Sequence, residues 1–125
     1  MTIHESAEDY LEKILILTER NGRVRSIDIV NEMNFSKPSI SIAMKKLREN
    51  GYVNMDRYGY ITLTDTGMEI ATRIYERHKL LTKVLMAIGV DPEKAAEEAC
   101  KIEHDIDDDT CEKIGAYYNT HMEQA

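Results

Sequence analysis

Residues 36–51, SKPSISIAMKKLRENG, contain both a start signal and a stop signal for one helix. Ser36 is a favoured N-cap residue, and Pro38 falls in the first turn, where its missing N–H costs nothing. The Asn50-Gly51 pair is typical of a helix end. These signals predict a helix of about three turns, and they require the segments on either side to form separate elements.

The two faces of this helix differ in chemistry. Its inward residues recur at helical spacing: Ile40, Met44 and Leu47. Its outward residues are small and polar or basic: Ser39, Ser41, Lys45, Lys46 and Arg48. Directly after the stop, YVNM and YITLT flank a turn over residues 56–59, which predicts a β-hairpin with Arg57 at its tip.

Two further helices are expected before residue 36. The segment AEDYLEKILILTERNG follows Ser6 and has apolar residues in helical rhythm up to the Asn21-Gly22 stop. A short helix capped by Ser26 follows, with Ile27, Val30 and Met33 as its apolar stripe. Helix, turn, capped helix and β-hairpin is the order of a winged helix-turn-helix, a fold that binds DNA.

If this segment binds DNA, two kinds of side chain are expected to contact it. Short polar side chains let a helix approach the base edges, and basic side chains attract the phosphates. Free N–H groups at the helix start can also bind a phosphate. The expected DNA-binding residues are Ser26, Ser36, Lys37, Pro38, Ser39, Ser41, Lys45, Lys46 and Arg57. Each residue taken alone also has a structural explanation, such as capping or solubility, and winged helices also serve as protein-interaction modules.

The charge of the chain is divided along its length. The 125 residues carry a net charge of −7, yet residues 20–57 contain eight basic and four acidic side chains. Residues 79–125 contain five lysines and eleven acids. No apolar run approaches the roughly 18 residues of a membrane span, and the first ten residues lack the apolar stretch of a signal peptide. We therefore expect a cytoplasmic protein without a membrane partner, in which both cysteines remain thiols.

The second half predicts a helical domain. A long helix runs from the cap near residues 64–66 to a stop at Gly89, with Ile70, Ile74, Leu81, Leu85 and Ile88 on its apolar face. A helix over residues 91–106 begins at Asp91-Pro92, and residues 107–110 cap a last helix. Helices this short and apolar on one side need a partner, so we expect a homodimer that presents two recognition helices to a palindromic site.

The stretch EACKIEHD places three metal-binding side chain types close together. Cys100, Glu103 and His104 stand at i, i+3 and i+4 of the expected helix over residues 91–106, on one face. Thiolate, carboxylate and imidazole all bind first-row metals, although a single buried cysteine on an acidic helix explains the same pattern. Asp9 and Glu12, at i and i+3, and His78 are further ligand types, but spacing alone does not show that they meet the first three.

The sequence resembles the diphtheria toxin repressor and manganese transport regulator family of metal-dependent repressors. The resemblance covers nearly the whole chain, through EDYLEKILIL, SKPSIS, LTDTG, ERHKLL and EACKIEH in this order. It implies a mainly α fold with a small β-hairpin wing. Residues 1–64 would form the winged helix-turn-helix DNA-binding domain, and residues 65–125 a helical metal-binding and dimerisation domain.

The resemblance also implies a ligand set and a cofactor. The ligands would be Asp9, Glu12, His78, Cys100, Glu103 and His104. The cofactor would be a divalent transition metal ion, Mn²⁺ or Fe²⁺, with Zn²⁺ or Co²⁺ as alternatives. Manganese-sensing relatives tend to carry a carboxylate in place of Cys100, and iron-sensing relatives a methionine in place of Asp9. The expected site is thus a hybrid of soft and hard donors.

The leading hypothesis is a homodimeric repressor of metal-homeostasis genes that binds double-stranded DNA when its metal is bound, and not an enzyme. The alternative is a metal-independent winged-helix regulator or protein-interaction module. A small metalloenzyme built on the Cys, Glu and His set ranks below both, because no glycine-rich loop or additional nucleophile supports it. No small organic substrate is expected.

Overall fold

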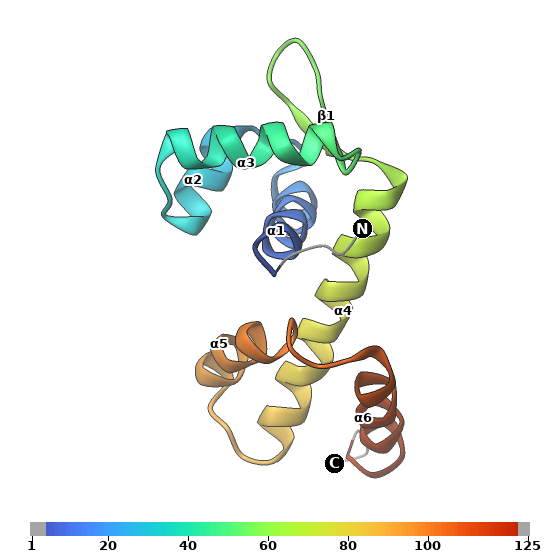
Figure 1. Ribbon diagram of the computed structural model, residues 1–125. Coiled ribbons are helices and arrows are strands. Elements are labelled where there is room, and N and C mark those ends of the chain that lie inside the picture. Colours follow the sequence, from blue (N-terminus) through green and yellow to red (C-terminus); the bar gives the residue numbers. More distant parts are fainter. Residues whose placement is uncertain (1–4, 123–125) are drawn as a thin grey trace. The chain divides into compact units, whose positions relative to one another are not determined.

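The computed structural model describes residues 5–122, which form six helices and one two-stranded antiparallel sheet (Figure 1). The elements are α1 (Glu5–Asn21), α2 (Ser26–Met33), α3 (Lys37–Glu49), β1 (Val53–Met55), β2 (Ile61–Leu63), α4 (Asp65–Ala87), α5 (Pro92–Ile102) and α6 (Asp108–His121). The expected fold class, mainly helical with a small hairpin, is confirmed. None of the helices within this range is long and apolar enough to cross a lipid bilayer.

The chain divides into two compact units, an N-terminal unit of Met1–Arg73 and a C-terminal unit of Ile74–Ala125. The long helix α4 contributes its first turns to the former and the rest to the latter. In the N-terminal unit, α3 packs against α2 and β1, and α1 packs against α2 and β2. Its fully buried side chains include Leu11, Ile14, Ile29, Ile40, Met44 and Ile61. Each such aliphatic side chain contributes about 1.5–3 kcal/mol by leaving water.

The recognition-type helix α3 has the start, stop and faces that its sequence predicts. The Ser36 hydroxyl accepts a hydrogen bond from the Ser39 backbone N–H at 3.3 Å. Asn50 is the C-cap residue, and Gly51 has the positive φ of +78° that follows many helix ends. Ile40, Met44 and Leu47 are buried. The opposite face of α3 is therefore free for solvent or a ligand.

Three predictions for α1 and α2 are wrong in detail. Ser6 does not precede α1, because the helix already includes Glu5. Ser26 is the first residue of α2 and not its cap: Arg25 is the N-cap, and its backbone N–H donates to the Asp28 carboxylate at 2.8 Å. The buried residue of α2 is Ile29, whereas Ile27 is 42% exposed. In a short helix, residue spacing alone does not determine which side faces the core.

The hairpin forms the expected wing. Val53, Asn54 and Met55 pair with Leu63, Thr62 and Ile61. The Asp56 carboxylate accepts hydrogen bonds from the backbone N–H groups of Tyr58 and Tyr60, both at 2.9 Å, and closes the turn. The hairpin base is anchored by the Ile61 N–H, which donates to the Val24 carbonyl at 2.7 Å.

The C-terminal unit consists of the remainder of α4 with α5 and α6. Asp91 and Asp107 cap α5 and α6 as expected, accepting from the N–H groups of Glu93 and Thr110. The predicted helix over residues 91–106 is too long, because α5 ends at Ile102. Ile88 lies in the turn after α4 and is 66% exposed, so it is not part of a buried stripe.

Gly67, in the first turn of α4, permits the close approach of the wing segment. A Cβ atom at this position would lie 2.0 Å from the Tyr52 carbonyl oxygen. We predict that Gly67→Ala lowers the free energy of unfolding by about 1–3 kcal/mol, because the clash outweighs the better helix propensity of alanine. Chemical unfolding followed by circular dichroism measures this change.

The matched control is Gly115→Ala in α6. Its Cβ would lie 3.4 Å from the Leu80 Cδ2 atom, an ordinary contact. Alanine here should leave stability unchanged or raise it by up to about 1 kcal/mol. Equal effects of the two substitutions would contradict the close approach at Gly67.

Candidate metal centre and nucleic-acid interface

The end of α5 places the predicted ligand residues of the C-terminal unit. Cys100 lies in the last turn of the helix, and Glu103 is its C-cap residue, still with helical φ and ψ of −59° and −23°. His104 lies beyond the cap, in the turn that leads to α6. The expectation that all three stand on one helix is therefore wrong for His104, although the Glu103 and His104 side chains remain 3.4 Å apart.

Three of the predicted ligand residues converge within the C-terminal unit. The potential donor atoms of His78, Cys100 and Glu103 all lie within 4.8 Å of one another. His78 comes from α4, and its Nδ1 atom is 2.9 Å from the Glu103 Oε2 atom. Two helices distant in sequence thus bring an imidazole, a thiol and a carboxylate to one point.

The cluster holds a positive charge on its imidazole. Hydrogen bonding to Cys100 and to Glu103 raises the pKa of His78 to about 10, against a smaller opposing effect of burial. An imidazole with this pKa is protonated at neutral pH. A metal ion that binds His78 must therefore displace a proton.

Glu103 supplies the observation that fits a metal. Its side chain is fully buried, at 0% exposure, and its Oε1 atom accepts no hydrogen bond from the described residues. The His104 Nε2 atom lies 3.4 Å from this oxygen. A buried carboxylate oxygen without a hydrogen bond is costly unless a cation compensates it. The donor set of thiol, carboxylate and imidazole matches a first-row divalent transition metal ion.

Asp9 and Glu12 lie in the N-terminal unit, one turn apart on α1. Asp9 is half-buried and Glu12 is 1% exposed. Both side chains offer carboxylate oxygen atoms that can bind a metal ion. On α4, Thr82 donates its hydroxyl hydrogen to the His78 carbonyl at 2.7 Å.

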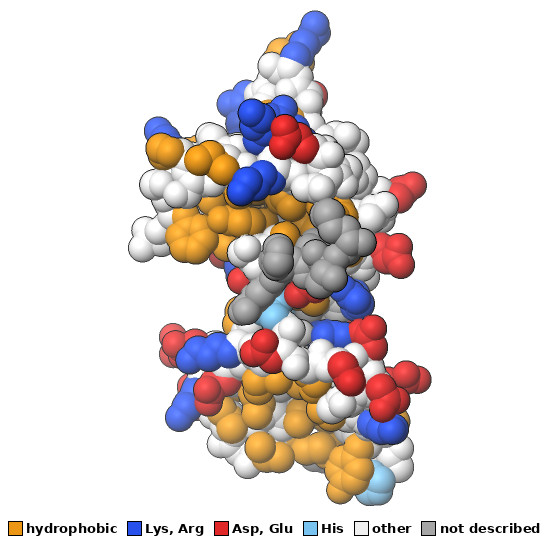
Figure 2. Space-filling view, in the orientation of Figure 1, with side chains coloured by type: hydrophobic (Ala, Val, Ile, Leu, Met, Phe, Trp, Pro, Cys, Tyr) orange, Lys and Arg blue, Asp and Glu red, His pale blue; other side chains and the backbone are white. Residues whose placement is uncertain are grey.

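The predicted DNA-contacting residues lie mostly on the exposed surface of the N-terminal unit. Figure 2 shows lysine and arginine side chains around the wing and on the neighbouring surface. Ser26 is half-buried; the others are exposed, namely Ser36, Lys37, Pro38, Ser39, Ser41, Lys45, Lys46 and Arg57. The exposed face of α3 also includes Ile42, at 58% exposure. This surface combines small, apolar and cationic side chains, as a DNA-reading helix requires.

Basic residues at the base of the wing escaped the sequence prediction. The guanidinium groups of Arg23 and Arg25 lie 5.0 and 4.7 Å from the Tyr60 ring centroid. Arg25 also donates to the Tyr58 carbonyl at 2.6 Å. Because the wing fixes their positions, the sequence alone offers only one signal for these residues, the spacing of two arginines before α2. They extend the positive surface toward α2.

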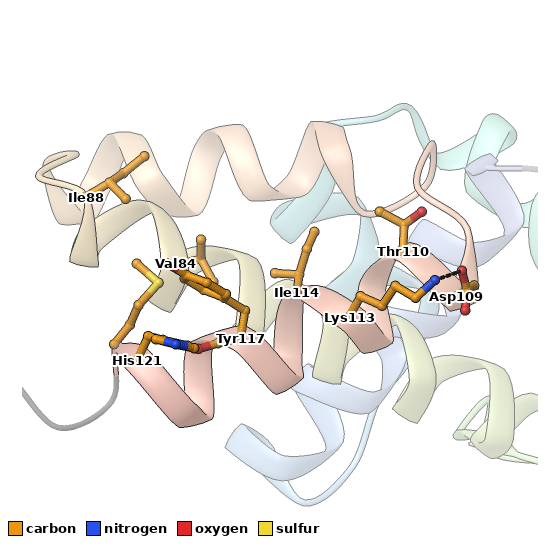
Figure 3. Close-up of a pocket in the computed structure, with 9 residues that line it drawn as sticks. Val84, Ile88, Asp109, Thr110, Lys113, Ile114, Tyr117 and His121 are labelled. Atoms are coloured by element: carbon orange, nitrogen blue, oxygen red, sulfur yellow. Dashed lines mark hydrogen bonds and ion pairs between the residues drawn. The ribbon is translucent and has the colours of Figure 1, made fainter.

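An apolar groove lies between α4 and α6 in the C-terminal unit (Figure 3). Its volume is about 670 Å³, and Val84, Ile114 and Tyr117 line it. Ile88 and Tyr117 are 66% and 59% exposed. Exposed apolar side chains gathered in one groove are typical of an interaction surface.

The sequence matches two family profiles that together cover nearly the whole chain. Residues 2–61 match "Iron dependent repressor, N-terminal DNA binding domain", and residues 64–124 match "Iron dependent repressor, metal binding and dimerisation domain". An uncharacterized HTH-type transcriptional regulator of Methanocaldococcus jannaschii is 37% identical over 112 residues, 88% of this chain and 90% of that protein. The HTH-type transcriptional regulator MntR of Listeria monocytogenes is 36% identical over 110 residues, 88% of this chain and 78% of that protein.

A solved structure shares the arrangement. A manganese-dependent transcriptional repressor in complex with manganese superposes with a TM-score of 0.83 at 30% identity, over 90% of this chain. The chain spans about half of that protein, 52% of its length. Its relatives are transcriptional regulators, and the resemblance drawn from the sequence motifs is confirmed. The chain belongs to the iron-dependent repressor family, the group that includes the manganese regulators of the MntR type.

Proposed function

We propose that this chain is a homodimeric, metal-activated transcriptional repressor of metal-ion homeostasis genes, acting in the cytoplasm. Residues 1–64 would bind DNA, and residues 65–125 would bind metal and form the dimer. The observation that carries the proposal is the fully buried Glu103 carboxylate beside His78 and Cys100, in a chain whose other unit exposes a basic recognition helix. A metal-binding cluster and a DNA-binding surface on one chain are the two parts of a metal sensor.

The proposed ligands are His78, Cys100, Glu103 and His104 with Asp9 and Glu12. The last two come from α1, which belongs to the DNA-binding unit. A bound Mn²⁺ or Fe²⁺ ion supplies the positive charge that lets several carboxylates share one site. Zn²⁺ and Co²⁺ are the alternatives that the Cys100 thiolate favours.

Regulation then follows from linkage. If Asp9 and Glu12 are ligands, the arrangement in which they join His78, Cys100 and Glu103 binds metal more tightly than any other arrangement. The metal-bound state therefore favours one placement of the DNA-binding unit. If that placement also favours DNA, metal raises DNA affinity, and DNA raises metal affinity by the same factor.

The proposed DNA contacts divide by chemistry. Ser39 and Ser41, with Pro38, would approach base edges in the major groove, and the N–H groups at the start of α3 with Ser36 and Lys37 would bind phosphate. Lys45, Lys46 and Arg57 would neutralise phosphates, and the Ser26 hydroxyl would donate a hydrogen bond to a phosphate oxygen. A symmetric dimer presents two copies of α3, so the operator would be palindromic.

The apolar groove between α4 and α6 supports the dimer. The family profile over residues 64–124 names dimerisation as well as metal binding. Val84, Ile114 and Tyr117 offer an apolar surface that a second copy can cover.

We predict that metal raises the DNA affinity of the wild-type chain by about 5- to 150-fold, the usual range of allosteric coupling. Glu103→Gln should remove this rise, because the amide keeps the shape of the side chain but loses the charge that binds the ion. Fluorescence anisotropy of a labelled duplex measures the affinity, under anaerobic conditions at fixed salt, with Mn²⁺ or with chelator.

The control for Glu103→Gln is Glu97→Gln, an exposed residue on the same helix, which should keep the metal response. Equal wild-type affinity in Mn²⁺ and in chelator would instead identify a metal-independent winged-helix regulator.

Metal binding should release a proton from His78. Because its pKa of about 10 keeps the metal-free imidazole protonated, rising pH removes the competing proton and tightens metal binding. We predict that His78→Gln releases about one proton fewer per bound Mn²⁺ than the wild type, between about pH 6 and 8. Calorimetry in buffers of different ionisation enthalpy counts the protons, and equal counts would exclude His78 as a displaced acid.

The Cys100 thiolate should set the metal preference. We predict that Cys100→Glu shifts the ratio of affinities toward Mn²⁺ and away from Zn²⁺ and Co²⁺, because a hard oxygen replaces the soft sulfur. Competition against a fluorescent chelator measures each affinity. Cys111→Ala, which removes the buried thiol of α6, is the control and should leave the preference unchanged. Unaltered selectivity in Cys100→Glu would contradict this role.

A further inference from the structure

Arg77 is a buried charge on the apolar stripe of α4. It lies three residues after Ile74 and four before Leu81, both buried, and is itself only 9% exposed. A guanidinium is rarely buried without compensating partners, because its desolvation is costly. The burial of Arg77 therefore points to a specific set of acceptors.

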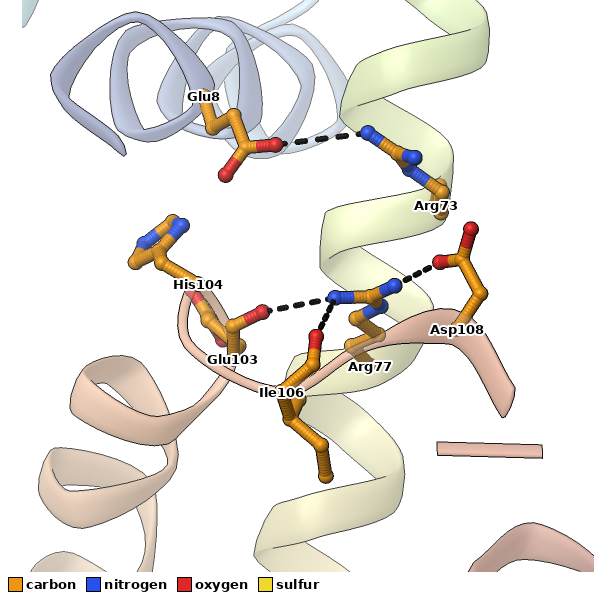
Figure 4. Close-up of polar contacts among 7 residues, drawn as sticks. All are labelled: Glu8, Arg73, Arg77, Glu103, His104, Ile106 and Asp108. Carbon is orange, nitrogen blue, oxygen red and sulfur yellow. Dashed lines mark hydrogen bonds and ion pairs between the residues drawn. The ribbon is translucent and has the colours of Figure 1, made fainter. Parts of the chain in front are cut away.

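These acceptors lie in the turn between α5 and α6 and at the start of α6 (Figure 4). The Arg77 Nη1 atom donates to the Glu103 carbonyl at 3.1 Å and to the Ile106 carbonyl at 2.7 Å. The Nη2 atom pairs with the Asp108 carboxylate in the first turn of α6. Carbonyls at a helix end lack donors within the helix, and one side chain supplies them here. Arg77 thus ties both ends of the turn to α4.

The same turn presents the Glu103 carboxylate to the cluster. Arg77 holds the Glu103 main chain, and the next residue of α4, His78, contacts its side chain at 2.9 Å. Two consecutive residues of one helix therefore fix both ends of Glu103. The hydrogen bonds of Arg77 among the described residues go to the Glu103 and Ile106 carbonyls and to the Asp108 carboxylate.

We propose that Arg77 is a positioning residue for the metal site, which fixes the 103–106 turn so that the Glu103 carboxylate meets His78 and Cys100. This inference rests on the proposed function. Outer residues that orient metal ligands typically change metal affinity by about 10- to 100-fold. Arg77 would act in this way through the main chain of a ligand instead of through a ligand side chain.

The charge of Arg77, considered alone, predicts the opposite change in metal affinity. A fixed guanidinium charge repels a divalent cation, so removal of that charge alone would tighten metal binding. Loss of positioning weakens it. The direction of the change in metal affinity therefore separates the two effects.

The test is direct Co²⁺ binding by the purified full chain, without DNA and under anaerobic conditions. Arg77→Met should weaken Co²⁺ binding by about 10- to 100-fold. At saturating Co²⁺ it should also change the charge-transfer band from the Cys100 thiolate, because the ligand geometry changes. Arg77→Lys, which keeps the charge but cannot bridge two carbonyls and Asp108, should give a smaller loss of the same kind.

The matched control is Arg73→Met, one turn earlier on α4. Arg73 is 44% exposed and pairs with Glu8 on α1 at 3.4 Å. This variant should keep the wild-type affinity for Co²⁺ within about twofold and an unchanged spectrum, since a partly exposed ion pair contributes little.

The outcomes are distinct. Unchanged or tighter Co²⁺ binding by folded Arg77→Met, with the wild-type spectrum, overturns the proposal, even if the variant melts at a lower temperature. If circular dichroism shows that Arg77→Met is unfolded, Arg77→Lys decides: wild-type affinity and spectrum overturn the proposal, and a weakened, altered site supports it. A wild-type chain that binds no Co²⁺ overturns the proposed function and this inference together.

Discussion

The burial of the Glu103 carboxylate is the constraint on which the chemistry of the candidate metal site depends. A fully buried Glu103 needs positive charge, and the cluster provides it through the His78 imidazole, whose pKa is raised to about 10. In the metal-free chain a proton therefore occupies the role that a divalent cation would take. A divalent cation that binds His78 would displace this proton, so the proposed metal affinity would depend on pH.

The helix α4 connects this chemistry to the DNA-binding unit along the chain. Its first turn begins beside the wing, where Gly67 lies against the Tyr52 carbonyl, and its later turns carry Arg77 and His78. Gly67 beside the wing and His78 of the metal-binding cluster thus belong to one helix, whereas the two proposed carboxylate ligands, Asp9 and Glu12, belong to α1.

Local signals in the sequence were sufficient for much of the fold. Ser36, Asp91 and Asp107 cap their helices as predicted, because capping depends on a few neighbouring backbone groups. The end of α5 was misplaced: Glu103 keeps helical dihedral angles, but the chain then turns so that its carbonyls meet Arg77, a residue 26 positions earlier. Such a tertiary acceptor pattern leaves only a weak trace, here a charged residue on an apolar stripe.

The candidate metal site was predictable only in part, because residue spacing within one helix is visible in the sequence and contacts between helices are not. The types and spacing of Cys100 and Glu103 suggested ligands, and the fold adds that His78 reaches them from α4. No periodicity could show this contact, because it depends on how two helices pack. The basic residues beside the wing, Arg23 and Arg25, were missed because their arrangement around Tyr60 exists only once the hairpin has formed.

The most direct test of the central claim is the reciprocity of metal and DNA binding. The Mn²⁺ affinity of the wild-type chain should be measured with and without a saturating duplex selected from a random pool in the presence of Mn²⁺. We predict that the duplex tightens Mn²⁺ binding by the same factor by which Mn²⁺ tightens DNA binding. An Mn²⁺ affinity that is identical with and without DNA would contradict it.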